Sequence, residues 1–250
     1  MIKRAAKKLY QDSVSMFSDL KATKKLSTLK DGDYFVDGDV PYQCQFASPE
    51  LVKDILEKKL SATDDPKWKD FGYKTKKDYE FWSLRLCGIA SLKMILDYYK
   101  LTNNKKVAEL TNEGVELGGY VIYDNKGNLE DKGWFYKPLV ELGKKYGLKG
   151  YSSSYLSANH LCSLIFTNKL VIASVNPCII RFDKLKGSES PGGHLVVVFG
   201  FKIKDGRLVG FYINNPSGKK DETRVKVYIP INTFKNAFDK KGMVFWKQEK

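Results

Sequence analysis

The sequence predicts an α+β fold in which helices occupy the first part of the chain and an antiparallel sheet the last third. Residues 87–99 are apolar around most of a helical circumference, so they are expected to form a helix buried at the centre of the domain. Residues 170–175 and 194–201 are continuous apolar runs of strand length, as expected of strands buried on both faces. Helices followed by strands are typical of α+β proteins, whereas α/β proteins alternate the two.

Residues 1–39 are expected to be a helical N-terminal extension outside this domain. Over residues 1–30, apolar side chains share one helical face, namely Ala5, Leu9, Met16, Phe17 and Leu20. Charged residues and glycines at 30–33 and 37–39 then break the pattern. The chain of 250 residues is 42% hydrophobic, which suffices for one sizeable core, so residues 40–250 are expected to form a single domain.

Three shorter helices are expected from the residues at their ends. Ser48 as N-cap and Pro49 at the first helical position begin one that is expected to run through Leu60. Residues 134–146 carry apolar side chains at helical spacing and form the second. Ser157 opens the third, which is short.

The remaining segments are assigned from composition and turn signals. The chain at Val40-Pro41 is expected to be extended, because a residue before proline avoids the helical region. Residues 61–79 are highly charged and are expected to lie on the surface. A polar turn is expected at 124–127, and strands at 208–213 and 223–229 complete the sheet.

The chain is basic, with a formal net charge of +14 at pH 7. Lysine pairs recur along the whole sequence instead of clustering, and neither a phosphate-binding glycine loop nor a nucleic-acid motif accompanies them. This distribution favours a solvated surface and predicts no nucleic-acid partner. The apolar runs are too short to span a membrane and no apolar segment follows the basic N-terminus, so a cytoplasmic protein is expected.

Four cysteines, Cys44, Cys87, Cys162 and Cys178, are separated by long intervals. None forms a CxxC pair, so neither a disulfide framework nor a metal site is expected, and no cofactor motif is present. Cys162 and Cys178 suit the role of buried structural cysteines.

The candidate nucleophile is Cys87, which lies in the first turn of the expected central helix. A thiol there meets the positive end of the helix dipole, which favours the thiolate. The backbone N–H of Cys87 also points out of the helix end and can donate to an oxyanion. Gly88 beside it is expected to let a substrate backbone approach closely.

The candidate base is one of only two histidines, His160 and His194. His160 lies on a short polar helix, whereas His194 opens the most apolar strand of the chain, where a scaffold can hold a side chain rigidly. Asn215, between the strand at 208–213 and Pro216, is the candidate for orienting the imidazole, because its amide oxygen can accept from a ring N–H. The adjacent Asn214 is expected to face the other way.

Four segments resemble the C39-like peptidases, a branch of the papain-like cysteine peptidases. Residues 86–99 resemble the nucleophile helix of that family and residues 193–201 its histidine strand. Residues 214–218 resemble the turn in which an acidic residue precedes proline, and residues 40–45 resemble the opening Val-Pro-x-x-x-Gln. The resemblance covers roughly residues 40–230 and keeps the family order Gln, Cys, His, Asn.

The resemblance implies a papain-like fold with a buried nucleophile helix packed on an antiparallel sheet. It implies a thiol-dependent hydrolase that cleaves a peptide or isopeptide amide, with a peptide or protein as its partner. The catalytic roles carried over are nucleophile for Cys87, base for His194, orienting residue for Asn215 and oxyanion donor for Gln45.

The sequence departs from the family pattern in two places within the resemblance. The orienting residue is usually aspartate, whereas Asn215 stands here, as asparagine does in papain. The interval between Gln45 and Cys87 is long and holds an inserted helix, as in a subset of the family. Two alternatives stay open: a peptidase-like module that binds a peptide without cleaving it, and a basic protein that binds nucleic acid or a membrane surface.

Overall fold

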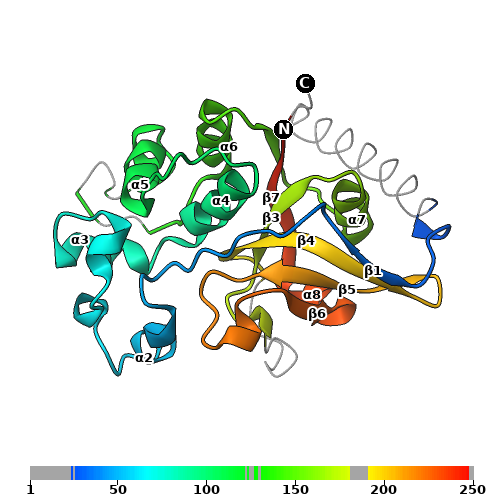
Figure 1. The fold of residues 1–250 in the computed structure, drawn as a ribbon, viewed down its shortest axis with the longest axis horizontal. Helices are drawn as coiled ribbons and strands as arrows, with labels where there is room; N and C mark the ends of the chain where they lie inside the picture. Colours follow the sequence, from blue (N-terminus) through cyan, green and yellow to red (C-terminus); the bar gives the residue numbers. More distant parts are fainter. Residues whose placement is uncertain are drawn as a thin grey trace.

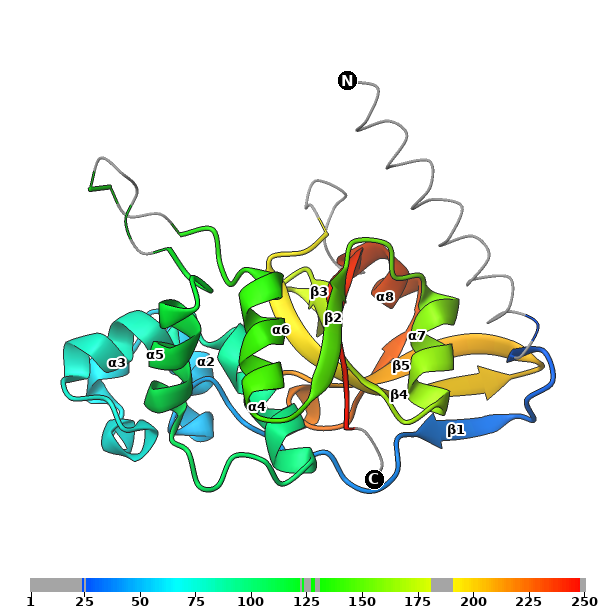
Figure 2. The same ribbon diagram turned by 90° about the horizontal axis from the view of Figure 1, so that it is seen from above.

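A computed structural model describes Lys24, residues 26–121, Tyr123, Gly127, Asn128, and residues 131–180 and 191–247. The helix expected over residues 1–30 and the turn expected at 124–127 lie largely outside these residues. Figures 1 and 2 show a helical side and a sheet side, with α4 lying between them. The expected α+β architecture is therefore confirmed.

The described residues include one seven-stranded antiparallel sheet with the order β2-β7-β3-β4-β5-β6. The strand β1 pairs with β4 beside β3: β3 covers the start of β4, at 194–198, and β1 covers its end, at 200–203. The bounds are β1 Gly32–Phe35, β2 Lys149–Ser153, β3 Leu170–Val175, β4 His194–Lys204, β5 Arg207–Asn214, β6 Val227–Pro230 and β7 Phe238–Trp246.

Helices cover both faces of this sheet and build the other side of the molecule. Figure 1 shows α8 on the opposite side of β4 and β5 from α4, α6 and α7. The α-helices are α2 Val52–Leu56, α3 Lys76–Ser83, α4 Cys87–Tyr98, α5 Val107–Glu116, α6 Tyr136–Lys145, α7 Ala158–Phe166 and α8 Ile231–Ala237. Short 3₁₀ helices occur at Pro49–Leu51, Ala62–Asp64, Trp68–Phe71 and Asp221–Thr223.

The central helix α4 confirms the strongest prediction from the sequence. It begins at Cys87, and its residues from Gly88 to Leu92 and from Met94 to Leu96 are buried. The helix packs across β4, whose residues are buried from His194 to Phe201. A helix with this apolar circumference has a low free energy only when protein covers it on nearly all sides.

The expectation that residues 61–79 lie on the surface holds for the charged side chains other than Asp65, but not for the segment as a whole. Asp65 and Tyr79 are both fully buried, and the segment folds into two 3₁₀ helices and the start of α3. The Asp65 carboxylate accepts hydrogen bonds from Ser48 Oγ (2.6 Å), from the N–H groups of Ser48 and Lys67 (3.0 and 2.9 Å), and from Tyr79 Oη. A buried charge needs such partners, and they hold Ser48 and Tyr79 around Asp65 in the interior.

The helix expected from Ser48 to Leu60 is also shorter than predicted. A 3₁₀ turn begins at Pro49 and α2 ends at Leu56, so Leu60 lies outside it. Ser48 does not cap the helix with its side chain, because its hydroxyl bonds to Asp65 instead. A tertiary hydrogen bond to a buried carboxylate has replaced the local cap.

No pattern in the sequence predicted β1, β2, β7, α5 or α8. The strand β7 lies inside the sheet between β2 and β3, although it contains the polar run Asp239-Lys240-Lys241-Gly242. Lys240 has a positive φ of 62°, and the register of β3 with β7 shifts near this point. The irregularity leaves room for these polar residues within the strand. Because of them, the sequence does not show the apolar pattern of a strand.

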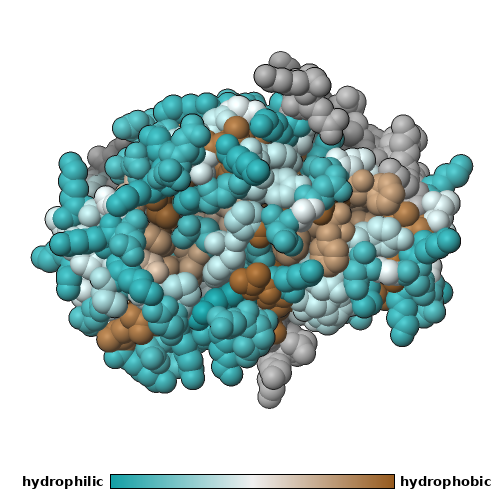
Figure 3. Space-filling model, in the orientation of Figure 1, coloured by the Kyte–Doolittle hydropathy of each residue, from teal (hydrophilic) through white to brown (hydrophobic). Residues whose placement is uncertain are grey.

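On the surface, hydrophobic residues occur in small separate patches between hydrophilic ones on the face shown in Figure 3. Such scattered exposure is ordinary for a folded domain. Within the residues that the structure describes, no helix is long and apolar enough to cross a membrane.

Candidate active site

A cleft with a volume of about 610 Å³ lies between the helical side and the sheet side of the molecule. Its helical wall is formed by α2 and by Leu84 and Cys87. Its sheet wall is formed by Pro177, Cys178 and Ile180, by Gly193 and His194, and by the loop 215–223. The cleft brings together all the residues selected from the sequence, namely Gln45, Cys87, His194 and Asn215.

Main-chain groups at the start of β4 connect the first turns of α4 to the strand that carries His194. The thiol of Cys87 lies close to the backbone of Leu195, the residue after His194. One helical turn further along α4, Ser91 Oγ donates to the Leu195 carbonyl oxygen (3.2 Å). Residues four apart on a helix share a face, so both contacts bind the same face of α4 to one residue of β4. This fixes where the nucleophile helix sits relative to the histidine.

Gly88 does not face the substrate, in contrast to the expectation from the sequence. It is buried, and a Cβ atom at this position would lie 2.9 Å from two atoms of the Trp134 ring. Trp134 also donates from Nε1 to the Arg85 carbonyl oxygen (2.7 Å), just before α4 begins. The glycine therefore lets an indole pack against the first turn of the nucleophile helix.

The imidazole of His194 is held by the amide of Asn215. His194 Nε2 lies 2.9 Å from Asn215 Oδ1. The orientation of this amide follows from its other bonds, because Nδ2 donates to the Thr223 carbonyl oxygen (3.3 Å) and Oδ1 accepts from the Ser217 N–H (3.2 Å). An amide oxygen can only accept, so Nε2 carries the hydrogen and the neutral ring has its lone pair on Nδ1.

Gln45 is positioned by the turn that carries Asn215. The backbone N–H of Gln45 donates to the Pro216 carbonyl oxygen (2.9 Å), and Cys44 Sγ donates to the same oxygen (3.3 Å). Tyr42 Oη donates to the Asn215 carbonyl oxygen (3.0 Å). Two segments far apart in the sequence are thus joined, and Gln45, with an exposed fraction of 4%, lines the cleft.

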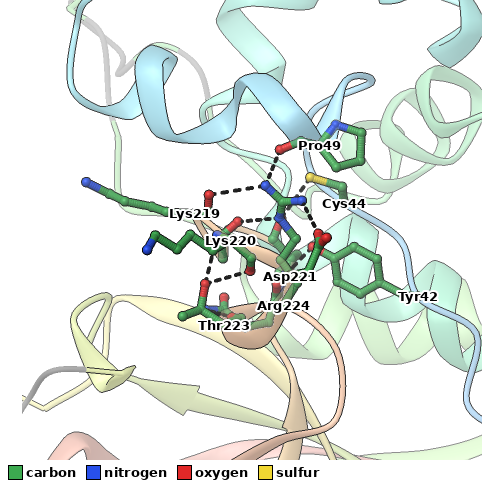
Figure 4. Close-up of polar contacts among 11 residues, drawn as sticks. Tyr42, Cys44, Pro49, Lys219, Lys220, Asp221, Thr223 and Arg224 are labelled. Carbon is green, nitrogen blue, oxygen red and sulfur yellow. Dashed lines mark hydrogen bonds and ion pairs between the residues drawn. The ribbon is translucent and has the colours of Figure 1, made fainter.

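A buried arginine closes the loop behind Asn215 (Figure 4). Arg224 donates from Nε to the Gly218 carbonyl oxygen (2.8 Å) and from Nη1 to Asp221 Oδ1 (2.7 Å). Its Nη2 donates to the carbonyl oxygens of Lys219 (3.2 Å) and of Pro49, at the start of the helical wall. Because its backbone oxygen also accepts from the Asn215 N–H (2.7 Å), Arg224 holds both ends of the loop.

Burial favours the uncharged forms of both candidate catalytic groups. It raises the pKa of the Cys87 thiol, an effect that hydrogen bonds with Leu195 and Gly88 offset only in part. It lowers the pKa of His194, while the hydrogen bond to Asn215 acts in the opposite direction. The thiolate favoured by the helix dipole is therefore not the resting form, because removing the thiol from water outweighs the dipole.

The other candidate residues from the sequence differ in whether they line the cleft. Asn214 faces away from the cleft as expected, since it donates to the Val40 carbonyl oxygen (3.2 Å) and accepts from the Lys226 N–H (2.9 Å). His160 lies on α7 and does not line the cleft, and Cys162 on the same helix is fully buried. Cys178 was expected to be a buried structural cysteine, but it is half-buried and lines the cleft.

Three contributors to the site were not found from the sequence: the backbone of Leu195, Ser91 and Ser217. Ser217 Oγ lies 3.1 Å from His194 Nε2. Main-chain groups carry no residue-specific signal, and Ser91 and Ser217 are common residue types that only their spatial partners distinguish. With a thiol, an imidazole and a carboxamide in one cleft, the arrangement can perform nucleophilic attack with transfer of the thiol proton.

Comparison with known proteins finds solved structures of C39-like peptidases and related proteases among those similar to this chain. A structure from Bacillus anthracis assigned to the C39-like peptidases has 20% identity and a TM-score of 0.51, covering 87% of this chain and 99% of that chain. The peptidase domain of Streptococcus ComA, a bifunctional ABC transporter involved in quorum sensing, has 16% identity and a TM-score of 0.42, covering 66% and 93%.

A double glycine motif protease from an AMS/PCAT transporter, solved in complex with the leader peptide, has 21% identity and a TM-score of 0.41, covering 65% of this chain and 84% of that chain. No curated protein matches the sequence. The fold is the papain-like fold expected from the sequence. The model of the Peptidase_C39 like family matches residues 39–245, and the chain therefore belongs to the C39-like peptidase family.

Proposed function

We propose that this protein is a cysteine hydrolase that cleaves an amide bond of a peptide or isopeptide through Cys87, His194, Asn215 and Gln45. The observation that carries the proposal is the 2.9 Å hydrogen bond between His194 Nε2 and Asn215 Oδ1. It leaves Nδ1 as the basic nitrogen of a histidine that lines the same cleft as the Cys87 thiol.

Catalysis begins with transfer of the Cys87 thiol proton to His194 Nδ1 as the sulfur attacks the substrate carbonyl carbon. The Nδ1–H of the imidazolium then protonates the leaving amine, the C–N bond breaks, and an acyl-thioester remains on Cys87. Water attacks this thioester after giving a proton to Nδ1, which returns it to the departing sulfur. The acid is released and the resting thiol is restored.

The developing oxyanion needs donors that are in place before the reaction. The Cys87 N–H belongs to the first turn of α4, whose N–H groups have no partner within the helix. Gln45 also lines the cleft and supplies a side-chain amide. Loss of one such donor costs roughly a hundredfold in rate, so Gln45→Ala is expected to lower kcat by about that factor.

The cleft walls favour a substrate with an apolar side chain near the cleaved bond. Leu56 and Leu84 face the cleft with exposed fractions of 36% and 49%, and Pro177 and Ile180 line it from the opposite wall. Covering such surface is favourable by roughly 25 cal/mol per Å². Charged residues of both signs line the cleft as well, namely Lys53, Glu57, Lys219, Lys220 and Glu222.

The proposal is tested by the reactivity of Cys87. The intact protein is treated with limiting iodoacetamide between pH 4 and 9, and the label is located by peptide mass. Because the pKa of His194 is lowered from 6.5 and that of Cys87 is raised from 9.0, the pair holds one shared proton between those limits. Labelling of Cys87 assisted by His194 is therefore expected to persist below pH 6.5 and to fall only in stronger acid.

Two variants test whether the labelling of Cys87 depends on its pairing with His194. In His194→Ala, Cys87 labelling at pH 6 is expected to fall at least about tenfold, because the base is lost. The matched control is Cys178→Ser, which removes the other thiol in the cleft and leaves Cys87 labelling unchanged. Equal labelling of all four cysteines, or no effect of His194→Ala, would overturn the proposal.

A peptide-binding module without turnover is the second candidate. It is favoured by the uncharged Asn215 amide behind His194 and by the burial that keeps both candidate catalytic groups neutral. Peptide-library turnover separates the two: cleavage that is abolished in Cys87→Ala supports the hydrolase. Retention of the same peptides by wild type and Cys87→Ala, with no cleavage by wild type, supports the binding module.

A further inference from the structure

The hydroxyl of Ser217 forms a second contact with the ring nitrogen that Asn215 holds. Ser217 Oγ lies 3.1 Å from His194 Nε2 and 3.3 Å from Asn215 Oδ1. The backbone N–H of Ser217 donates to the same Asn215 oxygen (3.2 Å). Ser217 is half-buried and lines the cleft. The three side chains thus form a closed group around one N–H.

The direction of each hydrogen bond follows from the donors present. Asn215 Oδ1 can only accept, so Nε2–H points between this oxygen and Ser217 Oγ. The Ser217 hydroxyl can accept from Nε2–H while donating its own hydrogen to Asn215 Oδ1, because a hydroxyl is both donor and acceptor. One N–H of the imidazole is therefore shared between two oxygens.

The loop geometry keeps Ser217 in this place. A Cβ atom at Gly218 would lie 2.2 Å from the Thr223 carbonyl oxygen, so the two strands of the loop are in direct contact there. Arg224 binds the Gly218 carbonyl oxygen on the same turn. The hydroxyl is thereby presented to His194 by a loop with little freedom to move away.

We propose that Ser217 is a positioning residue that shares the Nε2–H of His194 with Asn215 and stabilises the imidazolium formed during the reaction. In a buried site a positive ring gains from each acceptor directed at it, and the acceptor Asn215 supplies is uncharged. The hydroxyl provides a second acceptor for Nε2–H and so helps to keep Nδ1 as the basic nitrogen of the ring. The inference rests on the proposed role of His194 as base.

The titration of His194 tests this without any substrate. The measurement uses the Cys87→Ala variant, which removes the thiol that lines the same cleft as the ring. The charged groups around the ring are the same in all variants compared, namely Arg224 behind Asn215 and the cleft residues Lys53, Glu57, Lys219, Lys220 and Glu222. The ¹⁵N chemical shifts of the two ring nitrogens report the tautomer and the protonation midpoint. The chain has only two histidines, so His160 serves as an internal reference.

Ser217→Ala is expected to lower the midpoint of His194 by about half a pH unit or more and to leave that of His160 unchanged. Ser217→Thr keeps the hydroxyl and is expected to restore the midpoint. Ser217→Cys, of similar size but a weak acceptor, is expected to behave like alanine. A His194 midpoint and tautomer that are the same in the serine, alanine and cysteine forms would overturn the proposal, whatever the protein hydrolyses.

Turnover of a cleaved peptide provides the second readout, in the chain with Cys87 intact. Ser217→Ala is expected to lower kcat about fivefold with little change in KM, and Asn215→Ala somewhat more. Because both oxygens share one N–H, the double variant is expected to lose more than the product of the two single effects. If the double variant lost no more than the product of the two single effects on kcat, the two oxygens would not share the Nε2–H. A shifted midpoint without turnover in any form would support Ser217 while rejecting the hydrolase.

Discussion

The nucleophile helix and the segment between Gln45 and Cys87 line the same cleft but are held by different interactions. The helix α4 is fixed mainly by apolar contact, with Gly88 against Trp134 and buried side chains along β4. The inserted segment is organised around Asp65, a fully buried carboxylate. Apolar packing tolerates changes of pH, whereas a buried charge does not, so the comparison predicts two distinct responses to mutation and acid.

The largest effect is expected from Asp65→Ala. Four donors from Ser48, Lys67 and Tyr79 would be left in a buried site without their acceptor. Removing one partner of such a network costs about 3–5 kcal/mol, measured as the free energy of unfolding in urea. Asp70→Ala, at an exposed position of the same segment, is the control and is expected to cost less than about 0.5 kcal/mol. Similar losses of stability in both variants would show that the inserted segment is not organised around Asp65.

Lowering the pH is expected to destabilise the inserted segment before the nucleophile helix. The loss of stability in acid is expected to be smaller than the loss in Asp65→Ala. Burial alone raises the pKa of Asp65, but hydrogen bonds from Ser48, Tyr79 and Lys67 outweigh it and hold the pKa below 3.8. The stabilisation is therefore complete above pH 3.8 and is lost as the pH falls through the lowered value in the folded state.

Hydrogen exchange of backbone amides in α3 and α4, followed as the pH is lowered, measures this difference. Exchange in α3, corrected for its intrinsic rate, is expected to accelerate first. In Asp65→Asn, which does not titrate, the difference between the helices should no longer change with pH. Simultaneous loss of protection in both helices of the wild type would show that the segment is not a separate unit.

A smaller loss, about 1–3 kcal/mol, is expected from Gly88→Ala. The new Cβ would lie 2.9 Å from the Trp134 ring, so either the indole or the first turn of α4 must shift. Since that turn carries Cys87, iodoacetamide labelling of Cys87 should change together with stability. Gly88→Ala combined with Trp134→Leu, which makes room for the methyl group, is expected to cost less than the sum of the two single changes. Full additivity would mean that the two side chains do not compete for space.

The smallest effect is expected where the two sides of the cleft meet at an exposed ion pair. Lys219 Nζ lies 2.9 Å from Glu57 Oε1, and the two side chains are 35% and 30% exposed. Water and salt screen such a pair, so Lys219→Ala should change the free energy of unfolding by no more than about 1 kcal/mol. Lys220→Ala, next along the loop, is the control. A loss comparable to that of Asp65→Ala would show that this exposed pair contributes as much to stability as the buried network around Asp65.

Much of the candidate site could be selected from the sequence because its residues occupy the ends of strongly patterned elements. Cys87 begins α4 and His194 begins β4, two of the most apolar segments of the chain. Asn215 follows β5 directly, so the sheet brings it to His194. Ser217 could not be selected in this way, because only its distance to the ring distinguishes it from other loop serines.

Hydrophobic periodicity by itself determined the central helix, β3 and β4, because long apolar runs have a low free energy only when they are buried. Tertiary structure decided what depends on partners far away in the sequence. It placed Asp65 inside, inserted the polar β7 into the middle of the sheet and left Gly88 facing Trp134. Polar and small residues have no preferred location of their own, and the groups that satisfy or crowd them exist only once the chain has folded.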